Sequence, residues 1–241
     1  MAATLHHVPC GEVVYEDGLA WQRSLWQRRV EDAIGDVLLT LTHDPVYTAG
    51  RHADLDRNLL RDDTGVRVVE VERGGDLTYH GPGQLVAYPI VALGSSKDVR
   101  WFVDALLEAC RRTVAAFGVV ATVDARRPGL WVDGRKLAAV GVRLDRSVTF
   151  HGLALNVAPD LDQFRAGIIP CGITDAGLCS LASLGVDTDL EEVREHLVRE
   201  LGTTLQRTVV ADSTDARTAR ALGPERSEAD AAAAASRQPE A

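Results

Sequence analysis

The most informative part of this chain reads Arg73-Gly74-Gly75-Asp76-Leu77-Thr78-Tyr79-His80-Gly81-Pro82-Gly83-Gln84. It combines five glycines or prolines with an arginine, an aspartate, a tyrosine and a histidine. Glycine lacks a Cβ atom and tolerates positive φ, so such a segment lets the backbone approach a ligand closely. The polar side chains would then supply a few oriented contacts. We interpret the stretch as a ligand-binding loop; the alternative is a long hairpin turn that binds nothing.

The segments around this stretch predict one α/β domain with sheets and helices over a single core. Apolar runs predict strands over 36–42, 66–71, 85–91, 119–123, 129–132, 137–144 and 148–157, with a loop over 45–51. Helices are predicted over 17–34, 98–118 and 189–205. Thr188 and Glu191 form the expected capping box of the last helix.

The chain changes character at Ala211, where serine, threonine, alanine, proline, arginine and glutamate begin to dominate. Large apolar residues nearly vanish there, so this part cannot bury a core. We expect a single catalytic domain over 1–210 and a disordered tail over 211–241.

The bulk composition limits the classes of function. The chain has 241 residues, of which 46% are hydrophobic and 25% charged, values typical of soluble globular proteins. The net charge of −9 disfavours nonspecific nucleic-acid binding. No apolar run is long enough to span a membrane, and the N-terminus lacks the pattern of a secretory signal. We therefore expect a cytoplasmic protein, and a monomer because no apolar helix face is left over.

A local concentration of positive charge stands out against this acidic background. It consists of Arg126, Arg127, Arg135, Lys136, Arg143 and Arg146. Such a cluster could dock an acidic protein partner. A hairpin face that is solvated and salt-bridged accounts for the same charges equally well.

Lys136 is unusual because 26 residues are lysine or arginine, yet Lys97 and Lys136 are the two lysines. A buried lysine can shift its pKa and act as a base, whereas arginine stays protonated. Lys136 follows an Asp-Gly turn at Asp133 and enters an apolar strand, where its amine could be partly desolvated. The alternative is an ordinary solvated hairpin lysine, which is also our interpretation of Lys97.

The four cysteines are too few and too scattered for a disulfide framework, and they contain no zinc-binding pattern. Cys110 falls on the apolar stripe of a helix and is interpreted as core, while Cys10 and Cys179 have no supporting context. Cys171 lies between Pro170 and Gly172, a setting in which backbone N–H groups could stabilise an oxyanion beside a nucleophile. A small buried cysteine in a turn is the alternative.

His151 opens a strand that reads His151-Gly152-Leu153-Ala154-Leu155-Asn156. It is a candidate for the polar wall of a site. A histidine whose hydrogen bonds are satisfied at a strand end is the other interpretation.

Together these segments resemble the lipoyl(octanoyl) transferase family. The resemblance rests on Arg73–Gln84, on Gly134-Arg135-Lys136-Leu137-Ala138, on His151–Asn156 and on Pro170-Cys171-Gly172, in that order, and it covers roughly 10–210. Asp76 departs from the family pattern, where glutamine or a similar residue is more usual.

The resemblance implies a fold like the catalytic domains of biotin and lipoate protein ligases. It implies that an octanoyl group moves from octanoyl-acyl carrier protein to a lysine of a lipoyl domain, the first step of endogenous protein lipoylation. The acceptors would be E2 subunits of 2-oxoacid dehydrogenases and the glycine cleavage H protein, and neither ATP nor a metal would be needed.

The family's residue roles carry over to matching positions of this sequence. Cys171 would form an acyl-thioester intermediate, with Lys136 beside it and His151 in a possible supporting role. The substrate-binding residues would be Arg73, Gly74, Gly75, Asp76, Leu77, Thr78, Tyr79, His80, Ala139, Val140, Gly141, Gly152, Leu153 and Ala154.

Three other functions remain open at this point. An ATP-dependent lipoate or biotin ligase on the same fold would make an acyl-adenylate and would need no cysteine nucleophile. A second alternative keeps Cys171 but changes the acceptor, for example in an enzyme that moves the acyl group between two lipoyl-type proteins. A non-catalytic module that binds acyl carrier protein would use only the basic cluster and would tolerate Cys171→Ala.

Overall fold

The computed structural model describes residues 3–60, 65–94, 98–124, 127–168 and 177–211. Within these ranges the strands are β1 Ala3–Val13, β2 Asp36–His43, β3 Val46–Ala49, β4 Arg67–Glu70, β5 Leu77–His80, β6 Gln84–Ile90, β7 Thr122–Asp124, β8 Arg127–Val132, β9 Arg135–Asp145, β10 Val148–Asn156 and β11 Arg207–Ala211. The helices are α1 Tyr15–Val30, α2 Leu55–Asn58, α3 Val99–Ala116, α4 Leu161–Gly167 and α5 Leu190–Leu205, with a short 3-10 turn at Ala182–Leu184.

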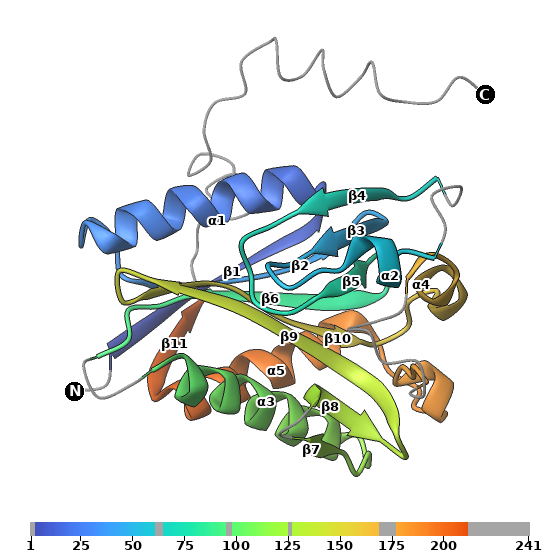
Figure 1. Ribbon diagram of the computed structural model, residues 1–241. Helices are drawn as coiled ribbons and strands as arrows, with labels where there is room; N and C mark the ends of the chain where they lie inside the picture. Colours follow the sequence, from blue (N-terminus) through green and yellow to red (C-terminus); the bar gives the residue numbers. More distant parts are fainter. Residues whose placement is uncertain (1–2, 61–64, 95–97, 125–126, 169–176, 212–241) are drawn as a thin grey trace.

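A mixed eight-stranded sheet is the centre of the described fold, in the order β11-β1-β2-β6-β10-β9-β8-β7. Strand β1 runs parallel to β2 and β11, and the pairs from β2 to β7 are antiparallel. Helices α3 and α5 cover one face, while α1 and a three-stranded sheet, β4-β3-β5, lie on the other (Figure 1). The expected α/β class with mixed sheets flanked by helices is confirmed.

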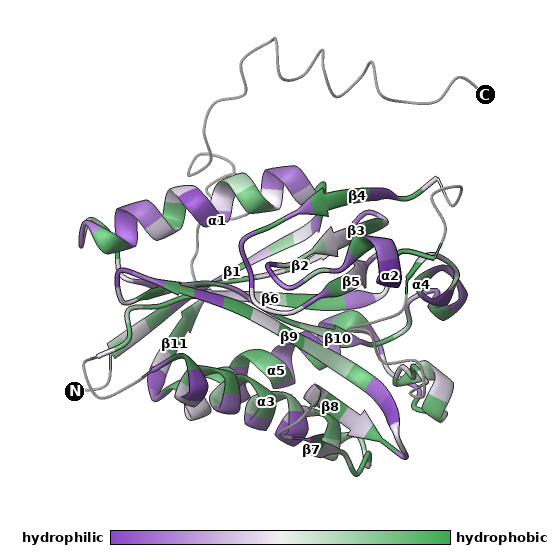
Figure 2. Cartoon of the chain, in the orientation of Figure 1, coloured by the Kyte–Doolittle hydropathy of each residue, from purple (hydrophilic) through white to green (hydrophobic). Residues whose placement is uncertain are grey.

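The main core lies between the large sheet and helices α3 and α5. Helix α3 buries Phe102, Leu106, Cys110 and Val114 completely, at the spacing of three and four residues that the sequence predicted. Cys110 is therefore core, as expected. Hydrophilic and hydrophobic residues alternate around the helices in Figure 2, as they do on helices with one buried face.

The ends of the helices differ in detail from the prediction. Asp189, not Thr188, caps α5, because its carboxylate accepts the Glu192 backbone N–H while the Thr188 hydroxyl donates to the Glu192 carboxylate. The first helix spans Tyr15–Val30 instead of 17–34. It ends early because Asp32 takes a positive φ of 53° and the Ala33 N–H donates back to the Arg28 carbonyl.

The expectation of one continuous loop over 73–84 was wrong. Leu77–His80 forms strand β5, which pairs with β3, and β3 lies where a loop over 45–51 was expected. Side chains alternate along β5: Leu77 and Tyr79 pack into an apolar cluster with Tyr47 and Phe164, while Thr78 and His80 point to the other side. Strands β1 and β11 and helices α2 and α4 were not predicted.

The hairpin of β8 and β9 agrees with the sequence. Asp133 and Gly134 have positive φ angles of 48° and 74°, as a tight Asp-Gly turn requires. At the other end of the described chain, Ala211 still belongs to β11, where it pairs with His7. The expected tail over 211–241 therefore begins inside a strand, and the rest of it, 212–241, lies outside the described residues.

Gly152 provides a test of the sheet. A Cβ atom at this position would lie 2.0 Å from the Ala87 carbonyl oxygen of β6, whereas one at Gly94 would meet nothing within 4 Å. We expect Gly152→Ala to lower the free energy of unfolding by about 3 kcal/mol. The control Gly94→Ala should stay within about 0.5 kcal/mol. Urea unfolding measures both, and equal stabilities of the two variants would contradict this packing.

Candidate active site

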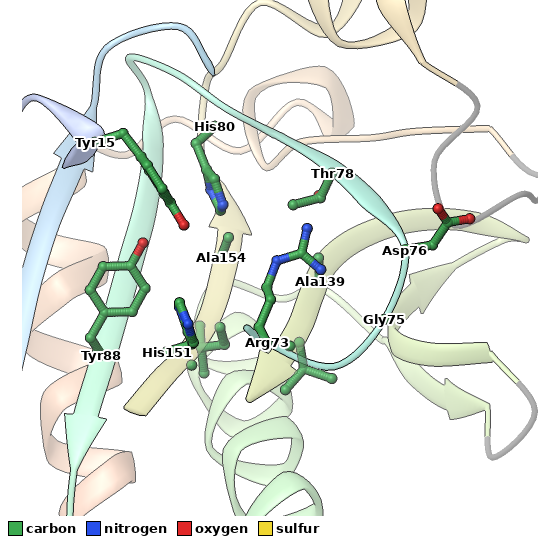
Figure 3. Close-up of a pocket in the computed structure, with 14 residues that line it drawn as sticks. Tyr15, Arg73, Gly75, Asp76, Thr78, His80, Tyr88, Ala139, His151 and Ala154 are labelled. Carbon is green, nitrogen blue, oxygen red and sulfur yellow. The ribbon is translucent and has the colours of Figure 1, made fainter. Parts of the chain in front are cut away.

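One pocket lies between β9 and β10 on one side and the segment around β5 on the other (Figure 3). Its lining consists of Tyr15, Arg73, Gly75, Asp76, Thr78, His80, Tyr88, Ala139, Val140, Gly141, His151, Gly152, Leu153 and Ala154. The structure thus brings together three segments that are far apart in the sequence and that the sequence analysis had singled out.

Three of the expected substrate-binding residues do not line this pocket. Leu77 and Tyr79 point away from it because they alternate with Thr78 and His80 along β5. Gly74 contributes its backbone N–H to the Val142 carbonyl at 2.9 Å, which fixes the segment onto β9.

Arg73 covers the pocket from the side opposite the sheet. Its side chain is buried, and the guanidinium donates to the hydroxyl and the carbonyl of Thr48, both at 2.7 Å. Gly141 makes this position possible, because a Cβ atom there would lie 3.0 Å from Cδ of Arg73 and 3.1 Å from the Gly74 carbonyl oxygen. A fixed positive charge therefore faces a pocket whose sheet side is made of glycine, alanine, valine and leucine.

Tyr15 and Tyr88 complete the polar wall and were missed by the sequence analysis. His43 lies behind them: its Nδ1 atom is 2.8 Å from the Val13 carbonyl oxygen, and its Nε2 atom is 2.8 Å from Oη of Tyr88. Since a carbonyl can only accept, Nδ1 carries the proton and Tyr88 donates to Nε2. No local pattern marks these residues, because Tyr88 sits in an apolar strand and Tyr15 at a helix start.

The histidines around the pocket are neutral at pH 7. Burial lowers the pKa of His43 to about 4, and burial together with the Arg73 charge lowers the pKa of His151 to about 3. Burial, followed by the neighbouring His43, lowers the pKa of His80 well below its ordinary value. The wall therefore offers uncharged hydrogen-bonding groups, and Arg73 supplies the charge.

A chain of hydrogen bonds connects the pocket with Lys136. The Asn156 amide donates to the Cys179 carbonyl at 3.0 Å, and its Oδ1 atom accepts from the Gln84 amide at 3.0 Å. Oε1 of Gln84 then lies 2.8 Å from Nδ1 of His80. The Cys179 N–H finally donates to the Lys136 carbonyl at 3.0 Å.

This chain determines the tautomer of His80. Carbonyl groups can only accept, so the contacts of Asn156 with Cys179 and of Gln84 with the Tyr79 carbonyl fix both amide orientations. Oε1 of Gln84 must therefore accept a proton from Nδ1 of His80. The Nε2 atom of His80 is left as a hydrogen-bond acceptor on the side of the pocket.

Lys136 is buried, which agrees with the interpretation of a desolvated amine and not with that of a solvated hairpin lysine. Its Nζ atom lies 5.6 Å from the centre of the Trp131 ring, and its side chain passes over Gly129, where a Cβ atom would be 2.7 Å from Cε. The Lys136 N–H donates to the Gly177 carbonyl at 2.9 Å. Lys136 is not among the residues that line the pocket, although its strand leads directly into it.

Cys171 lies outside the described residues. The three cysteines that the structure describes are all buried, and burial raises the pKa of Cys10 and Cys110 to about 12 and that of Cys179 to about 11. Each of these thiols therefore stays protonated near pH 7 and is a poor nucleophile.

The six residues of the basic cluster do not form one exposed patch in the described chain. Lys136 is buried, Arg143 pairs with Asp145 at 2.8 Å, and the Arg146 guanidinium lies 4.3 Å from the Trp26 ring centre. The side chains of Arg126 and Arg127 lie outside the described part. For the residues of the basic cluster that the structure describes, a salt-bridged hairpin face is therefore a better interpretation than a docking patch for an acidic partner.

Two searches of the described residues gave negative results. They contain no group of three or more histidine, cysteine, aspartate or glutamate side chains that could hold a metal ion. Of the helices in the described ranges, none combines the length and the apolar character that crossing a bilayer requires.

Comparison with known proteins gave consistent results. Residues 14–202 match the family model of the lipoyl protein ligase A/B catalytic domain. The chain is 43% identical to an octanoyltransferase from Thermobifida fusca, over 82% of this chain and 88% of the relative. It is 44% identical to an octanoyltransferase from Acidothermus cellulolyticus, over 83% of this chain and 90% of the relative.

The fold also matches solved structures. A crystal structure of lipoate-protein ligase A bound with ATP superposes with a TM-score of 0.73 and 18% identity, over 92% of this chain and 94% of that protein. At this identity the likeness concerns the fold alone, and it confirms the fold that the sequence resemblance implied.

The buried histidines predict a pH dependence of stability. Between its ordinary pKa of 6.5 and about 4, the unfolded chain binds a proton at His43 that the folded chain does not. The free energy of unfolding should therefore fall with decreasing pH through this window, by about 1.4 kcal/mol per pH unit for each such histidine. Urea unfolding between pH 7 and pH 5 measures this slope.

The contribution of one histidine is isolated by substitution. His43→Gln should make the slope shallower by about 1.4 kcal/mol per pH unit, because glutamine takes up no proton in either state. Equal slopes for the wild type and His43→Gln would show that His43 is not neutral in the folded protein.

Proposed function

The chain belongs to the lipoyl protein ligase A/B catalytic domain family, and we propose that it is an octanoyltransferase that acts through a thioester on Cys171. Its relatives at 43% and 44% identity are named octanoyltransferases, and we infer that the octanoyl transfer serves protein lipoylation. We assign the activity to residues 1–210. In this proposal the donor is octanoyl-acyl carrier protein, and the acceptors are lysines of lipoyl domains in E2 subunits and the glycine cleavage H protein. The proposed location of the reaction is the cytoplasm.

The observation that carries the covalent route is the environment of Lys136. A buried lysine that packs over a glycine is held in one place, and its backbone pairs with Gly177 and Cys179. Cys171 is only six residues before Gly177 in the sequence. Backbone hydrogen bonds thus attach the residues at Gly177 and Cys179, which follow the proposed nucleophile in the sequence, to the strand that carries the proposed base.

Lys136 has a different task in each half of the reaction. A free cysteine has a pKa of about 8.5, and a neighbouring ammonium group lowers it and so favours the thiolate. The Cys171 thiolate attacks the carbonyl carbon of the donor thioester, and the bond to the carrier sulfur breaks. The departing thiolate takes a proton from Lys136, which is left neutral beside the new thioester.

The second half returns both groups to their starting states. A lysine amine with a pKa of about 10.4 is almost entirely protonated at pH 7, so the acceptor must lose a proton before it attacks. Neutral Lys136 takes that proton. The amine then attacks the thioester, Cys171 leaves as thiolate, and the second proton of the acceptor nitrogen passes to solvent. Because the donor is already a thioester, the cycle needs neither ATP nor a metal.

The pocket suits the acyl part of this substrate. Ala139, Gly141, Gly152 and Ala154 form a floor of small apolar residues, while Val140 and Leu153 line it with their backbone and turn their side chains into the core against α3 and α5. Opposite this floor, Gly75 lets the backbone lie close to an alkyl chain. Burial of about seven methylenes at ~0.8 kcal/mol each contributes at most about 5–6 kcal/mol to binding.

The thioester is tested by intact mass after incubation with octanoyl-acyl carrier protein and no ATP. We expect a gain of one octanoyl group, which hydroxylamine releases and which Cys171→Ala lacks. Cys179→Ala is the matched control, because its buried thiol should not react. No gain without ATP, with acylation restored when octanoate and ATP are supplied, would instead indicate an adenylating ligase.

One variant distinguishes the two proposed tasks of Lys136, which are to lower the pKa of Cys171 and to take a proton from the acceptor amine. Arginine supplies a positive charge but does not deprotonate, so Lys136→Arg should retain some self-acylation and lose transfer to the lipoyl domain by about 100-fold or more. Single-turnover measurements that follow each half-reaction decide this. Transfer at the wild-type rate in the variant would refute the base role.

A further inference from the structure

One end of the pocket lies nearer to Lys136 along β9 than the other end does. Strand β9 leads from Lys136 through Ala139 and Gly141 to Val142. In the antiparallel partner β10 the residues opposite are Ala154 for Ala139, Gly152 for Gly141 and His151 for Val142. His151 therefore marks the end of the pocket farther from Lys136, and Figure 3 shows His80 and His151 at opposite ends with Ala154 between them.

Buried polar atoms without a hydrogen-bond partner lie on His151, which lines the far end of the pocket, and on Glu72 next to it. Nε2 of His151 and Oε2 of Glu72 are both buried, lie 4.0 Å apart, and have no hydrogen-bond partner among the described residues. Oε1 of Glu72 is held by the Arg23 guanidinium. A buried polar atom without a partner is costly, so apolar contact at this point is unfavourable unless water or a ligand supplies the missing bonds.

His151 is held in a strained position. Its φ is +58°, which is rare for a residue other than glycine, and its backbone N–H donates to Oε1 of Gln22 at 2.8 Å. Its ring stacks on Phe150 with centroids 4.9 Å apart. The residue is thus fixed in place by its surroundings, and strain of this kind tends to occur at functional positions.

The distance along the strand fits a chain of limited length. From Ala139 to Val142 is three residues, or about 10 Å at ~3.4 Å per residue. An extended eight-carbon acyl group has a comparable length. The His151 ring closes the pocket at this point, so a longer chain would have to displace a ring that is stacked on Phe150 and that lies next to the buried Oε2 atom of Glu72.

We propose that His151, together with Glu72, limits the length of the acyl chain and makes this enzyme select eight-carbon groups over longer ones. The inference rests on the proposed octanoyl transfer. It assigns His151 the role of a polar barrier at the far end of the pocket, while the reaction takes place at the end near Lys136.

The test is the ratio of kcat/KM for decanoyl- and octanoyl-acyl carrier protein. We expect the wild type to favour octanoyl by about tenfold or more. His151→Gly removes the barrier and fits the positive φ, so it should raise the ratio by about tenfold. His151→Asn also fits this φ but retains a shorter polar group, and it should raise the ratio by less.

His80→Asn is the matched control. It changes a buried histidine at the opposite end of the pocket, so octanoyl transfer should fall while the ratio stays at the wild-type value. A merely structural role of His151 would lower both rates together and leave the ratio unchanged.

The experiment distinguishes failure of the proposed barrier from failure of the proposed function. Octanoyl transfer by the wild type with an unchanged ratio in His151→Gly would overturn the barrier and leave the proposed function intact. If His151→Gly does not fold, an unchanged ratio in His151→Asn overturns the barrier in the same way. Absence of octanoyl transfer by the wild type would overturn the proposed function itself.

Discussion

The antiparallel pairing of β9 with β10 is the constraint on which the rest of the site depends. It places Gly141 opposite Gly152, and both lack the Cβ atom that would block a neighbour. Arg73 packs against Gly141, and the β6 backbone at Ala87 lies against Gly152. A side chain at Gly141 would push Arg73 and Gly74 away from the sheet, and one at Gly152 would force β10 and β6 apart, so either would change the shape of the pocket.

The same pair of strands relates the two ends of the pocket. Lys136 lies at the start of β9, and His151 lies opposite Val142 farther along it. A sheet is stiff along its strands because every residue is tied to its neighbours by hydrogen bonds. The register therefore fixes the separation between Lys136, the proposed base, and His151, the proposed barrier, which makes a strand pair suitable for limiting the length of an alkyl chain.

The polar side of the pocket depends on a different kind of constraint. Carbonyl oxygens at Tyr79, Cys179 and Val13 can only accept hydrogen bonds, and they fix the orientation of every amide and imidazole attached to them. As a result His80 offers an acceptor to the pocket, and Tyr88 donates to His43 instead of to a ligand. Burial keeps these histidines neutral, so Arg73 provides the fixed positive charge at the pocket.

Local sequence signals determined much of this protein. The spacing of apolar residues gave helices α3 and α5, the Asp-Gly turn gave the β8–β9 hairpin, and the motif at 73–84 led to the family. These features depend on residues that are neighbours in the chain. The strand at Leu77–His80 was missed because its pairing with β3 involves residues about thirty positions away, and no local pattern encodes that partner.

Only the tertiary structure decided which side chains share the pocket. Tyr15 and Tyr88 come from a helix start and an apolar strand, and they meet His151 because α1 packs against β6 and β10. The alternation of β5 turned Leu77 and Tyr79 away from a site in which the sequence had placed them. The sequence by itself thus determined the family and the local elements, which rest on short-range physics, while the composition of the site followed from long-range packing and strand register.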